Sequence, residues 1–238
     1  DGIILVCPSK VADAKMKMYN LDGSEGKMCG NGIRCVGKFL YDHGMVDINE
    51  KDEITIETLS GIKKLKAYTS GGKVNRLRVD MGKAILDPKE IPVVLDGDKV
   101  VDRPVEIAGK NYNITCVSMG NPHCVVFMDD IDNLDIETVG PEFENDKLFP
   151  ERVNTEFVTV LDDHTIKMRV WERGSGETWA CGTGACAVAV AACENGFCKK
   201  GEDIKIKLKG GDLIINYTDE TVYMTGNAEK VFEGEVEV

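Results

Sequence analysis

The sequence predicts an α/β (α+β) protein of two pseudo-symmetric domains, each a curved, mostly antiparallel sheet wrapped around a central helix. The prediction depends first on a repeat: the stretch at 28–35, MCGNGIRC, has a second copy at 180–187, ACGTGACA. Each copy opens an apolar helical pattern. Each also lies among many short alternating segments, and a sheet that curls around one helix would bury that helix on every side.

The register of the repeat extends well beyond the two motifs. Their cysteines, Cys29 and Cys181, lie 152 residues apart, and the same offset aligns KMKMY at 15–19 with KMRVW at 167–171. After a two-residue slip, EITI at 53–56 aligns with DIKI at 203–206. We therefore expect a first domain over 1–78, joined by a C-terminal strand at 227–238, and a second domain over 79–226.

The first half contains strands and one helix. Apolar runs or period-two alternation predict strands over 2–6, 14–19, 53–58, 62–68 and 74–81. A helix is predicted over 32–43, with Ile33, Val36 and Leu40 on one face and Gly44 as its stop. The polar segment 20–28 should be a loop, and glycine turns are expected at 60–61 and 71–72.

The second half should contain the same kinds of element. Three prolines in 87–104 predict a connecting stretch with a short strand, and 139–149 predicts one or two helical turns ended by Pro150. The helix at 184–194 is apolar all round and should be buried. Strands are predicted over 112–117, 124–128, 153–160 and 165–171, and three or four more should follow, with turns at 210–211 and 219–220.

The two halves differ in what precedes the motif. About 70 residues separate Asn111 from Cys181, but only 28 precede Cys29. The segments 2–8 and 154–160 correspond, so counterparts of 112–128 would lie ahead of Asp1. We therefore expect about 40 residues of a natural chain to precede Asp1.

The composition disfavours several classes of partner. A net charge of -12 disfavours nucleic acid and anionic membranes, and no window resembles the roughly 18 apolar residues of a membrane span. The nine cysteines are odd in number and form no CxxC pair, which is typical of free thiols in a reducing cytoplasm. No Cys/His spacing fits a zinc site. We expect a cytoplasmic protein with a small-molecule substrate and no metal, and a homodimer is the assembly to test.

A cysteine immediately ahead of each helix suggests acid–base chemistry. Free N–H groups and the helix dipole attract negative charge at such a position, and they are expected to lower a thiol pKa from roughly 8.5 toward about 3.5–7.5. The backbone N–H groups of Gly30, Asn31, Gly182 and Thr183 could hold a carboxylate. If a pseudo-two-fold axis aims both thiols at one carbon, one can remove a proton and the other can return one to the opposite face.

Four segments carry a resemblance to a known family. These are NLDGSEGKMCGNGIRC at 20–35, ERGSGETWACGTGACA at 172–187, GNPH at 120–123 and VNTEF at 153–157. They resemble the signature segments of the diaminopimelate epimerase family, and the resemblance covers essentially the whole chain. It implies two similar α/β domains with the site between them. It also implies interconversion of LL- and meso-2,6-diaminopimelate, without pyridoxal phosphate or other cofactor, in bacterial lysine and peptidoglycan-precursor synthesis.

The resemblance also implies roles for individual residues. Cys29 and Cys181 would be the acid/base pair, with the helix N–H groups binding the α-carboxylate. The distal, non-reacting end of the substrate would meet Asn20, Asn154 and Arg173, and the reacting end Asn121 and Glu172. His123 and Glu172 resemble the pair that tunes the thiols. The family's opening strand, its Gly-Asn-Asp-Phe segment and a later Gln have no counterpart here, which leaves the first domain's share of the pocket open.

Other functions remain as alternatives. One is a two-thiol racemase of the proline or hydroxyproline type, although Arg173 and the asparagines favour a substrate with a second charged end. Another is a truncated relative that binds diamino acids without turning them over. A third is a redox protein in which Cys29 and Cys181 cycle through a disulfide.

Overall fold

The computed structural model describes residues 2–20, 23–48 and 53–235. The chain divides into two compact units, which are described separately below. Unit 1 comprises Asp1–Val79 and Thr225–Val238, and unit 2 comprises Asp80–Met224. Over the described residues, no helix has both the length and the apolar character needed to cross a membrane.

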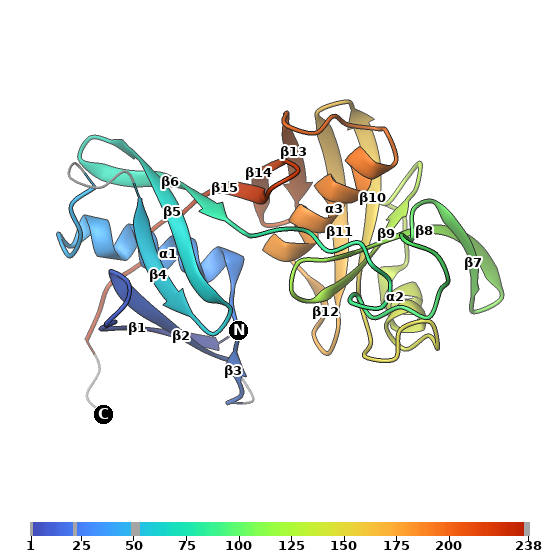
Figure 1. Cartoon of the computed structure of the whole chain (residues 1–238), viewed down its shortest axis with the longest axis horizontal. Helices are drawn as coiled ribbons and strands as arrows, with labels where there is room; N and C mark the ends of the chain where they lie inside the picture. The colour runs from blue at the N-terminus through green and yellow to red at the C-terminus, as the bar shows by residue number, and fades with distance from the viewer. Residues whose placement is uncertain (1, 21–22, 49–52, 236–238) are drawn as a thin grey trace. The chain divides into compact units, whose positions relative to one another are not determined.

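Unit 1 is a sheet packed against one helix, α1 (Gly30–Asp42). The strands lie in the order β1-β2-β4-β5-β6, and only β2 and β4 pair in parallel. Figure 1 shows α1 lying across β4 and β5, the strands that it contacts. The strand bounds are β1 (Gly2–Cys7), β2 (Ala14–Asn20), β3 (Glu25–Gly26), β4 (Ile54–Thr58), β5 (Gly61–Ser70) and β6 (Lys73–Asp80).

The core of unit 1 confirms the predicted face of α1. Ile33, Val36 and Leu40 recur at helical spacing and are all buried. The facing strands place alternate apolar residues toward them, among them Ile56 and Leu65, each with no exposed surface. The helix begins at Gly30, two residues before the predicted start, because Cys29 is itself the residue that caps it.

Unit 2 has the same plan with more strands. Its sheet runs β7-β8-β9-β10-β11-β13-β14, and the pairs β9/β10 and β11/β13 are parallel. Helix α3 (Gly182–Glu194) packs against β8, β9, β10, β13 and β14 (Figure 1). The bounds are β7 (Arg103–Ile107), β8 (Lys110–Ser118), β9 (Pro122–Phe127), α2 (Ile136–Glu144), β10 (Asn154–Asp162), β11 (Thr165–Glu172), β12 (Gly176–Thr178), β13 (Asp203–Leu208), β14 (Gly211–Tyr217) and β15 (Val222–Asn227), which contains the boundary between the units.

Helix α3 is buried all round, as its uniformly apolar sequence predicts. Every residue from Gly184 to Ala192 is buried.

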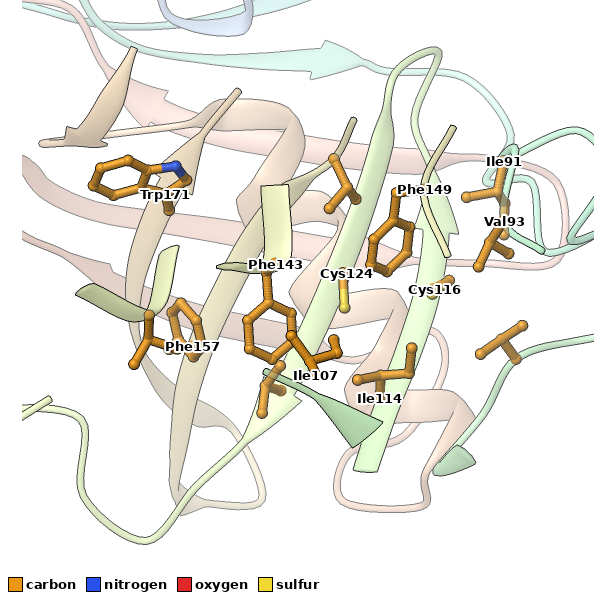
Figure 2. Close-up of a cluster of buried hydrophobic side chains, with 14 of the residues drawn as sticks. Ile91, Val93, Ile107, Ile114, Cys116, Cys124, Phe143, Phe149, Phe157 and Trp171 are labelled. Atoms are coloured by element: carbon orange, nitrogen blue, oxygen red, sulfur yellow. The ribbon is translucent and has the colours of Figure 1, made fainter. Parts of the chain in front are cut away.

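On the other face of the sheet, α2 and the segments around it form a second core, in which Phe143 packs between two other aromatic rings. Phe143 contacts Tyr112 with ring centroids 4.9 Å apart and Phe157 at 5.4 Å, and Figure 2 shows Phe143 and Phe157 side by side.

The elements around the two central helices correspond between the units. Helices α1 and α3 begin and end at positions 152 residues apart, the same offset as their cysteines. The antiparallel pairs β1/β2 and β10/β11 share a register, since Ile4 lies opposite Met18 and Glu156 opposite Val170. The fold class predicted from the duplication is confirmed.

Three local predictions were wrong. The C-terminal strand predicted over 227–238 is not present in the described residues. Strand β15 ends at Asn227, residues 228–235 form no strand, and Phe232 is 86% exposed. Residues 236–238 lie outside the described part. The helical turns predicted within 139–149 form one helix that begins at Ile136 and accommodates Pro141. A short strand, β3, lies in the segment 20–28, which was expected to be a loop.

Candidate active site

The sulfur of Cys29 caps helix α1. Cys29 has an extended backbone, and its Sγ accepts a hydrogen bond from the backbone N–H of Gly32 at 3.3 Å. Ser, Thr, Asp or Asn commonly makes this contact, so a cysteine here directs a reactive atom at the N–H groups of the first turn. Gly30 and Asn31 are the first two helical residues, so their N–H groups belong to the first turn.

Cys181 repeats this geometry at the start of helix α3. Its Sγ accepts from the N–H of Gly184 at 3.4 Å, and Gly182 and Thr183 follow as the first two helical residues. The thiol also lies 3.5 Å from the hydroxyl of Thr183. Within these two fully described helices, neither first turn contains an acidic residue that would compete with a bound anion.

A side chain on the third helical residue would meet a close neighbour in both helices, and the neighbours differ. A Cβ atom at Gly32 would collide with the Cδ1 atom of Ile4 on β1. A Cβ atom at Gly184 would lie 2.6 Å from a carboxylate oxygen of Glu156 on β10. Ile4 and Glu156 occupy equivalent positions in the repeat, so the same site beneath the helix is apolar in unit 1 and carries a carboxyl group in unit 2.

A chain of hydrogen bonds connects Cys181 with Glu156. The Thr183 hydroxyl, beside the thiol, accepts from the Nδ2 atom of Asn121 at 3.3 Å. The Oδ1 atom of Asn121 lies 3.1 Å from Nε2 of His123, and Nδ1 of His123 lies 2.7 Å from Glu156 Oε1. The structure therefore brings together four predicted site residues and adds one, Glu156, that the sequence did not indicate.

The environment of Cys181 corrects one expectation. Burial, followed by the charges of Glu172 and Glu156, raises the pKa of the Cys181 thiol well above its ordinary value. The hydrogen bonds from Thr183 and Gly184 act in the opposite direction but do not offset that rise. The helix N-terminus alone was expected to lower this pKa. Desolvation and two nearby carboxylates outweigh it here, so the pKa of Cys181 is raised instead.

The remaining predicted residues of unit 2 are Glu172, which ends β11, Arg173 in the turn to β12, and Asn154, which begins β10. Glu172 accepts a hydrogen bond from the hydroxyl of Thr178 on β12. Arg173 is half-buried; its backbone N–H donates to Asn154 Oδ1 at 3.0 Å, and its guanidinium donates to the carbonyl of Glu151 at 3.0 Å. Asn154 also donates to the carbonyl of Pro122 at 3.1 Å. Asn154 is buried, and its amide joins the turn that carries Arg173 to the segment before His123.

In unit 1, the remaining predicted ligand is Asn20 at the end of β2. Its side chain is exposed and donates to the hydroxyl of Ser24 at 3.0 Å. In the described part of the chain, no group of three His, Cys, Asp or Glu side chains has a metal-binding arrangement.

A second buried carboxylate, Glu144 at the end of α2, holds the turn that carries Glu172 and Arg173. Its Oε2 accepts from the indole N–H of Trp171 at 2.7 Å, and its Oε1 accepts from the backbone N–H of Gly174 at 2.8 Å and from Arg152 at 3.0 Å. Sequence patterns could not identify this residue, because its partners lie up to 30 residues away in the chain.

Replacing Glu144 with glutamine is expected to destabilise unit 2 and loosen this turn. An amide presents an N–H group to one of the donors that the carboxylate accepts, and a buried polar group left unsatisfied costs about 1–3 kcal/mol. Thermal unfolding should show that loss, and the KM of any substrate held by Arg173 should rise. Glu137→Gln on the same helix is the matched control, since Glu137 is exposed and in the first turn, where a charge contributes only about 0.3–1 kcal/mol. Equal effects of the two substitutions would contradict the role of Glu144.

Comparison with protein families gives one match that covers most of the chain. The model of the family described as diaminopimelate epimerase matches residues 1–86 and 115–231. Among curated relatives, the diaminopimelate epimerase of Acetivibrio thermocellus is 53% identical over 240 residues, which cover 100% of this chain and 84% of the relative. The diaminopimelate epimerase of Methanococcus maripaludis is 51% identical, covering 100% of this chain and 85% of the relative.

Solved structures with a similar fold are more distant in sequence. A probable proline racemase from Agrobacterium radiobacter, with bound carbonate, gives a TM-score of 0.72 at 16% identity, covering 95% of this chain and 73% of that one. A hydroxyproline epimerase from Agrobacterium vitis, with bound trans-4-hydroxy-L-proline, gives 0.70 at 15% identity, covering 95% and 71%. A PhzF-family phenazine biosynthesis protein from Bacillus anthracis gives 0.71 at 20% identity, covering 100% and 85%. At these identities the likeness concerns the fold alone.

Proposed function

This chain belongs to the diaminopimelate epimerase family and is an isomerase, and from that premise we propose that it interconverts LL- and meso-2,6-diaminopimelate with two cysteines as acid and base. The observation that carries the proposal is the repeated cap. Cys29 and Cys181 occupy equivalent positions, and each sulfur accepts a hydrogen bond from the third residue of a helix whose first N–H groups lie beside it. The proposed role in metabolism is to supply meso-diaminopimelate for lysine and peptidoglycan-precursor synthesis.

The proposed reaction moves one proton at a time. The thiolate of one cysteine takes the proton from Cα, so that the C–H bond breaks, an S–H bond forms, and the electron pair stays on the substrate. The thiol of the other cysteine gives its proton to the opposite face, which forms the new C–H bond and leaves that cysteine as a thiolate. One thiol must therefore be protonated while the other is not.

The carboxylate of the reacting centre is proposed to lie at the starts of the two helices. The N–H groups of Gly30, Asn31, Gly182 and Thr183 then stabilise the negative charge that spreads from Cα onto the carboxylate during the reaction. These donors are fixed by the helices, so they need no reorganisation when the charge develops. Glu172 and Asn121 are proposed to contact the reacting end.

The distal end of the substrate is proposed to meet Asn20 and Arg173. The planar guanidinium of Arg173 suits a carboxylate, because it can donate two parallel hydrogen bonds. Asn154 already donates to the Pro122 carbonyl and accepts from the Arg173 N–H. We therefore propose that Asn154 serves the distal site by holding this turn in place.

Incubation in D2O tests the proposed reaction. LL- and meso-diaminopimelate should each give the other stereoisomer, with one deuterium at Cα of every product molecule, by chiral chromatography and mass spectrometry. L-proline and trans-4-hydroxy-L-proline are the matched control substrates, because they lack the second charged end that Arg173 is proposed to bind. Exchange with proline but not with diaminopimelate, or tight binding of diaminopimelate without exchange, would contradict the proposal.

A further inference from the structure

Glu156 is a fully buried carboxyl group that the proposed reaction does not use directly. It is the third residue of β10, and neither Glu156 nor His123 has any exposed side-chain surface. Charged side chains are almost never fully buried without a partner, and here the described partner is the His123 ring at 2.7 Å. A buried pair of this kind, placed under a catalytic helix, calls for a functional explanation.

The direction of the hydrogen bonds follows from their chemistry. The Oδ1 atom of Asn121 can only accept, so Nε2 of His123 carries a proton and donates it. The Nδ2 atom of Asn121 can only donate, so Thr183 Oγ1 accepts from it and directs its own hydroxyl proton elsewhere. The next acceptor along the chain is the sulfur of Cys181, 3.5 Å from that oxygen. The donors from His123 Nε2 to Thr183 Oγ1 therefore point toward the thiol.

Two features favour a proton on Nδ1 of the same ring. The Nδ1 to Oε1 distance of 2.7 Å lies in the range of charge-assisted hydrogen bonds. In addition, the carboxyl group of Glu156 lies beneath the first turn of α3, close to Gly184, where the positive end of the helix dipole favours negative charge. The pKa of Glu156 is raised overall, because burial outweighs the opposing charge and hydrogen bond of His123.

We infer that Glu156 is a positioning residue that holds His123 as an imidazolium, whose Nε2–H group supports a thiolate at Cys181 through Asn121 and Thr183. Its importance for turnover rests on the proposed function, whereas the state of the ring does not. The other titratable groups that act on Glu156 or Cys181 here are Glu172 and Cys124.

The arrangement belongs to one half of the repeat. At the position equivalent to Glu156, unit 1 has Ile4, whose side chain fills the space beneath Gly32. Cys29 therefore caps its helix over a hydrocarbon surface, and Cys181 caps its helix over a carboxylate paired with a histidine. The two thiols differ in environment even though their caps are alike.

Nuclear magnetic resonance of the histidine rings tests the inference in the absence of substrate. The chain has three histidines, so His43→Gln and His164→Gln complete the assignment. In the wild-type protein, both ring nitrogens of His123 should remain protonated at about pH 7, above the ordinary histidine pKa of about 6.5. In Glu156→Gln, the midpoint of the His123 titration should fall by at least about one pH unit.

The matched control is Glu202→Gln. Glu202 lies 3.6 Å from His164 in an exposed pair, so the same substitution there should leave the His123 titration unchanged. A neutral His123 ring in the wild-type protein at about pH 7 would overturn the inference, even if Glu156→Gln failed to fold. A His123 titration unchanged in folded Glu156→Gln would also overturn it.

Turnover provides a second measurement. In Glu156→Gln, kcat should fall about tenfold or more in both directions with a smaller change in KM, because Glu156 acts on a thiol and not on the substrate. An unchanged kcat would refute the link from His123 to Cys181. A wild-type protein that shows the expected His123 titration but no epimerisation would refute the proposed function and leave the buried pair in place.

Discussion

Replacing Cys181 or Cys29 with alanine is expected to reduce the interconversion of LL- and meso-diaminopimelate by at least about 10²–10⁴-fold, the contribution of one acid–base group. A single remaining thiol cannot take a proton from one face of Cα and deliver one to the other. The rate of appearance of the second stereoisomer measures the loss. In these variants KM should change less than kcat, because each sulfur acts mainly in the transition state.

The controls for this prediction are other cysteines on the same helices. Cys35 is exposed on α1, and Cys193 is half-buried near the end of α3. Cys35→Ala and Cys193→Ala should keep turnover within about threefold, since surface substitutions usually change stability by no more than about 0.5 kcal/mol. If Cys29→Ala or Cys181→Ala kept turnover as high as these controls, the two-thiol mechanism would fail.

Replacing Phe143 with alanine is expected to have the largest effect on stability. Phe143 has no exposed surface and packs edge-on against both Tyr112 and Phe157, so truncation removes two aromatic contacts and leaves a cavity. The free energy of unfolding should fall by about 3–5 kcal/mol. Both tryptophans, Trp171 and Trp179, belong to unit 2, so their fluorescence during urea unfolding reports on this core.

Phe232→Ala is the control with the same change of side chain. Phe232 is 86% exposed, so its truncation should change the unfolding free energy by no more than about 0.5 kcal/mol. A Phe143→Ala protein as stable as Phe232→Ala would mean that the contacts of Phe143 with Tyr112 and with Phe157, the second of which Figure 2 shows, do not hold unit 2 together.

Much of the fold could be predicted because the duplication supplies two views of each element. The uniformly apolar composition of α3 predicts a fully buried helix, and α1 begins and ends at the corresponding positions of the repeat. Helix α2 was harder to predict, because Gly140 and Pro141 interrupt the periodic pattern near its middle. Gly140 is needed there because a Cβ atom would collide with the indole of Trp171, a contact that no local pattern reveals.

Some residues of the candidate site could be predicted from local sequence, and others could not. Cys29, Cys181 and the glycines after them form a local motif, so the chain shows them directly. Glu144 and Glu156 lie in segments whose pattern indicates only a helix and a strand. Their partners, Trp171 and His123, lie 27 and 33 residues away, so only the folded chain joins them.

Because a cysteine sulfur caps each helix, the stability of the first helical turn depends on whether that sulfur is protonated. A helix cap contributes about 1 kcal/mol, and an ionised sulfur accepts from the Gly32 or Gly184 N–H group more strongly than a neutral one. Under the proposed mechanism, each turnover would therefore tighten the first turn of one helix as it relaxes the other. Alkylation of either cysteine would both block chemistry and fray the helix behind it, so amide exchange at Gly32 and Gly184 would report on the protonation of the two thiols.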